Sequence, residues 1–287
     1  MSEATCILPI AAQLGEGILW CEREQMVWWV DIRAPSVNRY DPASGINTVF
    51  PMPEPVGCLG LGQDHRILCA LASGLSWLDP RDGTLTAFTP IEADEPRTRL
   101  NDGRVDRQGR LWVGSMNRDP DGPGGALYCA TADGALRLIE RGIRVPNCTA
   151  FSPDGRTMYF VDTPTRRIRA FDLDPATGAL SNDRTFTQIP DSEGGPDGGT
   201  VDAEGHLWVA QWDGACLSRF RPDGTRERIV PLPAKRPTCM AFGGADLDIL
   251  YITSASVGLA TPGPCDGGLM ALRPGVRGLP EARFATA

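Results

Sequence analysis

One pattern recurs six times along the chain and constrains the fold more than any other feature. Each copy has a leading residue, a short run, a turn rich in Asp, Gly or Pro, and then an apolar run. The leading residues are Glu16, Gly57, Asn101, Asn147, Asp197 and Thr238, so neighbouring copies are separated by 41, 44, 46, 50 and 41 residues. Repeats of about 40 to 50 residues that are rich in β-formers predict the blades of a propeller.

Each copy contains two hairpins. The match is closest between NDGRVDRQGRLWVGSM (101–116) and PDGGTVDAEGHLWVAQW (196–212), which align Asp106 with Asp202 and Trp112 with Trp208. A second hairpin follows, as in VNRYDPASG (37–45) and LSWLDPRDG (75–83). Two hairpins make four antiparallel strands, and no stretch has the periodicity of a helix. We therefore predict an all-β fold, a single six-bladed β-propeller over residues 1–287, whose ring is closed by a strand near Thr5 to Leu8.

Composition restricts the partners. The formal net charge is −8 and the charged residues are scattered, whereas nucleic-acid binding requires clustered Lys and Arg. No apolar stretch approaches the roughly 18 residues of a membrane span. The nine cysteines form no CxxC pair, which favours a reducing compartment. We expect a cytoplasmic protein that binds neither nucleic acid nor membrane and is a monomer or weak homodimer.

The leading residues predict a metal site. The innermost strand of each blade runs beside the central channel, so Glu16, Asn101, Asn147 and Asp197 should converge at one mouth of it. Carboxylate and carboxamide oxygens suit a hard divalent cation, and without one the carboxylates would repel each other. The alternative is that Asn101-Asp102-Gly103 and Asp197-Gly198-Gly199 are only turns, because such strings commonly close loops.

The other candidate catalytic or metal-binding residues match no known motif. His65 and His206 fall in turns and belong to no paired-histidine motif. No GxSxG string is present, and Lys235, the single lysine, lies in a Pro-flanked loop. Cys148 follows Asn147 directly, and the alternation of side chains along a strand predicts that it fills the core instead.

At these residues the chain resembles the regucalcin and gluconolactonase family of sugar lactonases, six-bladed propellers with one axial divalent metal. The resemblance runs through LGEGILW (14–20), RLNDGRVDRQGRLWVGSM (99–116), PNCTAFSPDGRTMYFVDT (146–163) and PDGGTVDAEGHLW (196–208). The chain departs from many relatives in having Ile18 in place of Pro and Cys148 in place of Gly.

The resemblance implies roles for individual residues. Glu16, Asn147 and Asp197 match the three metal ligands. Arg99 and Asn101 match residues that hold the sugar lactone, and Asp119 falls where an acidic substrate contact occurs. The loops 117–125 and 255–267 are expected to cover the site.

The expected activity is hydrolysis of a 1,4- or 1,5-lactone of a sugar to the aldonic acid. A divalent ion, one of Ca²⁺, Mg²⁺, Mn²⁺, Zn²⁺ or Fe²⁺, would polarise the lactone carbonyl. Asp197 would act as ligand and general base, or the metal itself would activate the water while Asp197 orients it. Two alternatives remain open: hydrolysis of another ester or lactone on the same metal, and a non-catalytic propeller that binds metal or protein.

Overall fold

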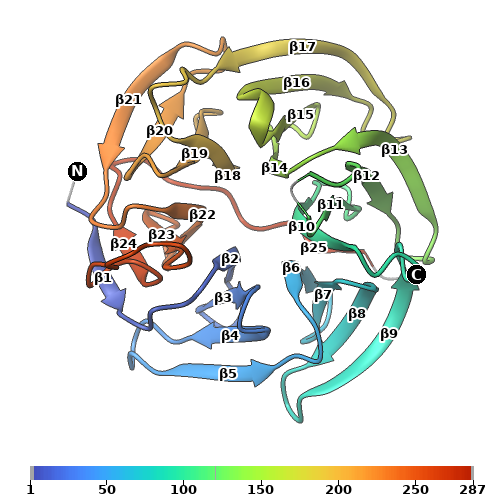
Figure 1. Cartoon of the computed structure of the whole chain (residues 1–287), viewed down its shortest axis with the longest axis horizontal. Coiled ribbons are helices and arrows are strands. Elements are labelled where there is room, and N and C mark those ends of the chain that lie inside the picture. Colours follow the sequence, from blue (N-terminus) through green and yellow to red (C-terminus); the bar gives the residue numbers. More distant parts are fainter. Residues whose placement is uncertain (1–2, 120, 286–287) are drawn as a thin grey trace.

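The structure is a computed structural model that describes residues 3–119 and 121–285, and within them the strands form six sheets around a central axis (Figure 1). Blade 1 contains β2 (Gly15–Cys21), β3 (Met26–Asp31), β4 (Ser36–Tyr40) and β5 (Asn47–Pro51). Blade 2 contains β6 (Val56–Gly62), β7 (Ile67–Leu71), β8 (Gly74–Asp79) and β9 (Thr84–Pro90). Blade 3 contains β10 (Thr98–Val105), β11 (Leu111–Asn117), β12 (Gly125–Ala130) and β13 (Leu136–Ile143).

Blade 4 contains β14 (Pro146–Phe151), β15 (Thr157–Asp162), β16 (Arg167–Leu173) and β17 (Leu180–Gln188). Blade 5 contains β18 (Gly195–Val201), β19 (Leu207–Trp212), β20 (Cys216–Phe220) and β21 (Arg226–Pro231). Blade 6 contains β22 (Pro237–Gly243), β23 (Ile249–Ser254) and β24 (Leu269–Leu272), with β1 (Thr5–Leu8) as its outer strand. The predicted propeller of six four-stranded antiparallel blades is confirmed.

The ring closes as the sequence predicted. Strand β1 pairs antiparallel with β24, where Thr5 faces Ala271 and Cys6 faces Met270. The first described strand of the chain therefore completes the last blade. This pairing covers an edge of β24 that would otherwise expose unpaired backbone groups.

Turn chemistry explains why the copies resemble one another. In blade 3 the Asp106 carboxylate accepts the backbone N–H groups of Gln108 at 2.9 Å and Arg110 at 3.0 Å, and the Trp112 indole N–H at 2.9 Å. In blade 5 Asp202 accepts the Trp208 indole at 2.8 Å in the same way. Each aspartate thus closes its hairpin turn and anchors the aromatic residue of the following strand.

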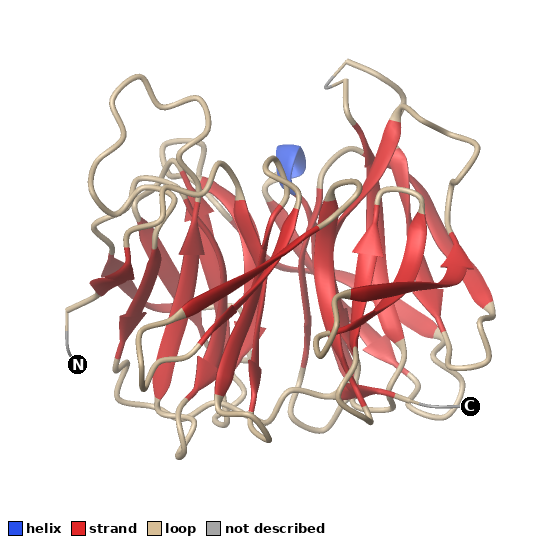
Figure 2. Ribbon diagram, turned by 90° about the horizontal axis from the view of Figure 1, so that it is seen from below, coloured by secondary structure: helices blue, strands red, loops and turns tan. Residues whose placement is uncertain are grey.

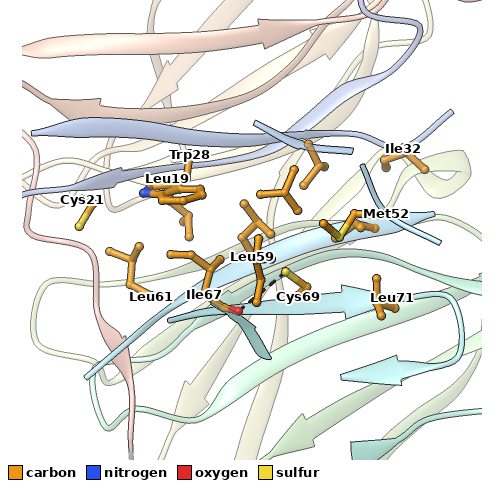
Figure 3. Packing of buried hydrophobic residues seen from close by; sticks show 14 residues of the cluster. Leu19, Cys21, Trp28, Ile32, Met52, Leu59, Leu61, Ile67, Cys69 and Leu71 are labelled. Carbon is orange, nitrogen blue, oxygen red and sulfur yellow. Dashed lines mark hydrogen bonds between the residues drawn. The ribbon is translucent and has the colours of Figure 1, made fainter. Parts of the chain in front are cut away.

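The hydrophobic core lies between neighbouring blades. Figure 3 shows the cluster between blades 1 and 2, in which the fully buried Trp28 packs with Leu59 and Leu61 across the interface. Equivalent clusters lie at the other blade interfaces, for example around Trp112 and Phe160 between blades 3 and 4.

The innermost strands are irregular at equivalent places. In all six described blades the pairing between the first and second strands shifts register, each time starting from one of the first three residues of the inner strand. The shift falls between Glu16 and Leu19 in blade 1 and between Pro196 and Gly199 in blade 5. Such bulges re-aim side chains, here at the mouth of the channel.

One strand was not predicted. The segment that follows β24 crosses the end of the channel opposite Glu16, and β25 (Arg283–Phe284) pairs parallel with the inner edge of β6 (Figure 1). Phe284 is fully buried between blades 2 and 3, and Glu281 forms an ion pair with Arg104 of β10. The C-terminal segment therefore obstructs the far end of the channel.

Helix is confined, in the described part of the chain, to the turn η1 (Thr163–Thr165), which lies at one end of the ring (Figure 2). None of the described residues forms a helix long and apolar enough to cross a membrane.

Candidate active site

The side chains predicted to gather at the axis do lie together. Glu16, Arg99, Asn101, Asn147 and Asp197 line a single pocket of about 220 Å³ at the end of the propeller where the inner strands begin. The remaining lining residues are Leu14, Met116, Val145, Thr163 and Trp212. The site is thus assembled from blades 1, 3, 4 and 5, as the repeat alignment predicted.

The turn interpretation of the two Asp-Gly strings is wrong. Asn101 to Gly103 lie inside β10, and Asp197 to Gly199 lie inside β18. Both strings are the bulged parts of inner strands, and their glycines are required by close packing. A Cβ atom on Gly198 would lie 2.7 Å from the Cys239 sulfur, and one on Gly103 would lie 2.5 Å from the Trp112 carbonyl oxygen.

The carboxylates of the pocket are buried, and the attraction of the Arg99 guanidinium offsets only part of the cost of their burial. Glu16 is 7% exposed and Asp197 is 5% exposed. Burial raises the pKa of Glu16, and the nearby Asp102 carboxylate raises it further. Burial also raises the pKa of Asp197 well above its usual range, with added repulsion from Glu16 and Asp102.

Among the described residues, no Lys, Arg or His nitrogen lies within 4.0 Å of the Glu16 or Asp197 carboxylate. The hydrogen bond to Glu16 comes from the N–H of Gly17, at 3.2 Å. Buried carboxylates of this kind are stable when they coordinate a cation. The donor set therefore fits a divalent metal ion that prefers oxygen ligands.

A hydrogen-bond relay orients the carboxamide of Asn147. Its Nδ2 donates to Thr163 Oγ1 at 2.9 Å, and Thr163 Oγ1 donates to the Pro196 carbonyl at 2.8 Å. Because the nitrogen is held by Thr163, the oxygen Oδ1 is the atom turned towards Asn101. Asn147 can therefore offer an oxygen to a cation, as a metal ligand requires.

Asn101 connects Asn147 to Arg99. Its Nδ2 donates to the Pro146 carbonyl at 2.9 Å and to Asn147 Oδ1 at 3.1 Å, while its Oδ1 accepts from Arg99 Nη1 at 2.7 Å. Both N–H groups of Asn101 are thus used within the protein. Burial lowers the pKa of Arg99 to about 10, although the guanidinium remains charged at neutral pH.

Asp119 lies outside the axial pocket. It lines an adjoining pocket together with Met116 and Val145, which belong to both pockets. Its Oδ1 accepts the N–H of Asp121 at 3.0 Å, within the loop that follows β11. The expected covering loops contribute no lining residue to the axial pocket among the residues described.

Several lining residues were missed by the sequence reasoning. Met116, Thr163 and Trp212 each end the six-residue run of the second strand, in LWVGSM, MYFVDT and LWVAQW. The aligned repeats therefore contained the signal, since a position shared by three blades lies at the same height along the axis. Asp102 was also missed: it does not line the pocket, but its buried carboxylate acts on both Glu16 and Asp197.

A second acidic group is unsuited to a metal. Ligand atoms of Asp202, Glu204 and His206 lie within 4.8 Å of one another. The buried Arg219 guanidinium already occupies this place, at 2.7 Å from Asp202 and 2.6 Å from Glu204. Asp202 also lies just beyond the end of β18 remote from Asp197. We therefore assign this group to a structural ion pair.

Cys148 fills the core, as predicted, and the structure shows how a cysteine fits where many relatives have glycine. It is fully buried between blades 4 and 5. Its φ is 55°, a left-handed conformation that favours glycine. Gly199 leaves room for the thiol, because a Cβ there would lie 2.7 Å from the Cys148 sulfur.

Known proteins resemble this chain along nearly its whole length. The family model described as SMP-30/Gluconolactonase/LRE-like region matches residues 14–256. An L-arabinolactonase of Azospirillum brasilense is 37% identical over 99% of this chain and 96% of its own. A 6-deoxy-6-sulfogluconolactonase of Pseudomonas putida is 37% identical over 98% of each.

Among solved structures, a calcium-binding protein, regucalcin, from Agrobacterium tumefaciens superposes with a TM-score of 0.94 at 33% identity, covering 99% of this chain and 97% of that one. The resemblance seen in the sequence motifs is thereby confirmed in both sequence and structure. With the family model covering residues 14–256, the chain belongs to the SMP-30/gluconolactonase/LRE-like family.

Proposed function

We propose that the protein is a sugar lactonase that opens the ring ester of an aldonolactone with water, giving the aldonic acid, and that it requires one divalent metal ion. The observation that carries the proposal is the pair of buried carboxylates, Glu16 and Asp197, which lie with Asn147 around one pocket and form no ion pair with a described residue. Relatives named as lactonases at 37% identity over nearly the full chain support the reaction class.

Glu16, Asn147 and Asp197 would hold the ion. A divalent cation supplies Lewis-acid polarisation of the lactone carbonyl when it is bound. Asp197 is the carboxylate assigned to accept the proton of the attacking water, since it is buried and lines the pocket. The acyl–oxygen bond of the ring breaks, and the ring oxygen leaves as a hydroxyl after gaining a proton.

Arg99 and Asn101 position the substrate. Arg99 uses Nη1 for the Leu100 carbonyl and Asn101 Oδ1, which leaves further guanidinium N–H groups for sugar hydroxyls. Asn101 is committed to Asn147 and Pro146, so its contribution is to hold Asn147 and Arg99 in place. Met116, Val145 and Trp212 supply apolar surface for the C–H groups of a sugar ring.

The test is acid release from glucono-, galactono-, xylono- and arabinonolactones, measured after chelator treatment and after adding back Ca²⁺, Mg²⁺, Mn²⁺, Zn²⁺ or Fe²⁺. Asp197→Asn should abolish hydrolysis, whereas Asp154→Asn, in an exposed turn of blade 4, should not. Full activity of folded Asp197→Asn, or turnover unaffected by chelator, would contradict the proposal. Phenyl acetate in the same panel tests the alternative of an aryl esterase.

A further inference from the structure

A second pocket adjoins the axial pocket at the same end of the propeller. It has a volume of about 300 Å³, and Met116 and Val145 line both pockets. A substrate that reaches the carboxylates of the axial pocket can therefore extend into the second one without crossing a blade.

The second pocket is rich in guanidinium groups. Arg33 follows β3, Arg118 follows β11, and Arg144 precedes β14, and all of them line it. Asp119 is the acidic residue on the same wall. Arg33 comes from blade 1, whereas the other described lining residues lie between Met116 and Pro164. Three loops that are distant in sequence thus bring positive charge to one place, in a chain whose net charge is −8.

Two of these guanidinium groups, those of Arg33 and Arg118, are not paired with a described carboxylate. Arg118 donates Nε to the Thr98 carbonyl at 3.1 Å, which leaves its terminal nitrogens for a ligand. The charge extends to the axial pocket, because Arg118 and Arg33 add to burial in lowering the pKa of Arg99.

We propose that the second pocket binds an anionic group on the end of the sugar lactone away from the carbonyl, so that the natural substrate is an acidic sugar lactone. This inference rests on the proposed lactonase function and names its substrate class. The planar fork of a guanidinium matches the oxygens of a carboxylate, a sulfonate or a phosphate. An anion bound beside Arg33 and Arg118 would relieve the repulsion between their guanidinium groups, whereas a neutral sugar would not.

The experiment compares D-glucono-1,5-lactone with three anionic analogues that carry a 6-carboxylate, a 6-phosphate or a 6-sulfonate. The wild-type protein should have the highest kcat/KM for one of the anionic lactones. In Arg33→Gln and Arg118→Gln, kcat/KM for that lactone should fall by about 10-fold to 100-fold, mainly through KM, as expected for a lost charge-assisted hydrogen bond. The ratio of anionic to neutral kcat/KM should fall by the same factor.

Arg221→Gln is the matched control, since it removes the same charge from the turn after β20, at the opposite end of the blade. It should leave the ratio unchanged. The inference is overturned if the wild-type protein has a higher kcat/KM for the neutral lactone than for every anionic one. It is also overturned if the ratio of anionic to neutral kcat/KM is the same in Arg33→Gln and Arg118→Gln as in Arg221→Gln.

A binding experiment by isothermal titration calorimetry tests the anion site independently of the proposed lactonase activity. Binding of 6-phospho-D-gluconate is compared with that of D-gluconate at a fixed metal concentration. If no lactone is hydrolysed under any metal, the lactonase proposal fails. The anion site still stands if the phosphorylated acid binds more tightly and Arg118→Gln removes the difference, and it falls if the two acids bind equally.

Discussion

Thr163 offers a test of the proposed metal site that changes none of the residues proposed to hold the ion. Its hydroxyl accepts from Asn147 Nδ2 at 2.9 Å and donates to the Pro196 carbonyl at 2.8 Å. Thr163→Val keeps the shape of the side chain and removes both hydrogen bonds. Asn147 is only 4% exposed, so water does not readily replace the lost partner. The carboxamide of Asn147 is then free to rotate its oxygen away from the site.

The expected effect follows from the two hydrogen bonds. Each contributes about 0.5 to 1.5 kcal/mol net, so their loss amounts to about 1 to 3 kcal/mol. This range agrees with the roughly 10-fold to 100-fold loss of metal affinity seen when a partner of a metal ligand is removed. Isothermal titration of the chelator-treated protein with Ca²⁺ and Mn²⁺ measures the change directly.

Thr165→Val is the matched control for this prediction. Thr165 lies in the same turn, is exposed, and donates to the Asp162 carbonyl at 2.7 Å, outside the Asn147 relay. Its substitution should leave metal affinity unchanged, and Thr163→Ser should restore it because the hydroxyl is retained. If Thr163→Val binds both metals as tightly as the wild-type protein and Thr165→Val, Asn147 is not oriented by this relay.

Further predictions concern the parts of the fold that frame the site. Asp202→Asn should lower the free energy of unfolding in urea by about 1.5 to 3 kcal/mol, because it weakens a buried charge-assisted hydrogen bond to Arg219, which stays paired with Glu204 and Glu227. Glu204→Gln, at a side chain that is 58% exposed, should change the free energy of unfolding by less than about 1 kcal/mol. If chelator treatment lowered the free energy of unfolding of the wild-type protein to that of Asp202→Asn, a metal at Asp202 would be indicated instead. Phe284→Ala should cost about 3 to 5 kcal/mol, since the ring is fully buried against Trp77 and Phe88, and metal affinity measured by titration should not change. Deletion of residues 1–8 should lower the melting temperature and promote self-association in light scattering, because β24 becomes an exposed edge; an unchanged melting temperature would show that β1 contributes nothing to closure.

The sequence alone determined the ring and most of the site. A repeat places equivalent residues at equivalent heights along the axis, so aligning the copies was enough to bring Glu16, Asn101, Asn147 and Asp197 together. The same reasoning extends to Thr163 and Trp212, which share a repeat position with Met116. Asp106 and Asp202 each hold the tryptophan six residues later in the same hairpin. These contacts are local, so the sequence motif alone was enough to predict the repeated hairpin.

Only the tertiary structure decided what depends on contacts outside the repeat. The C-terminal segment has no counterpart in other copies, so its course across the channel and the pairing of β25 with β6 follow from packing alone. The bulges that aim Glu16 and Asp197 inward are register shifts, which arise from pairing between strands and not from one strand's pattern. The guanidinium groups of the second pocket come from loops of blades 1, 3 and 4. Charged residues in loops follow no periodic pattern in the sequence, so only the closed ring shows that these loops lie together.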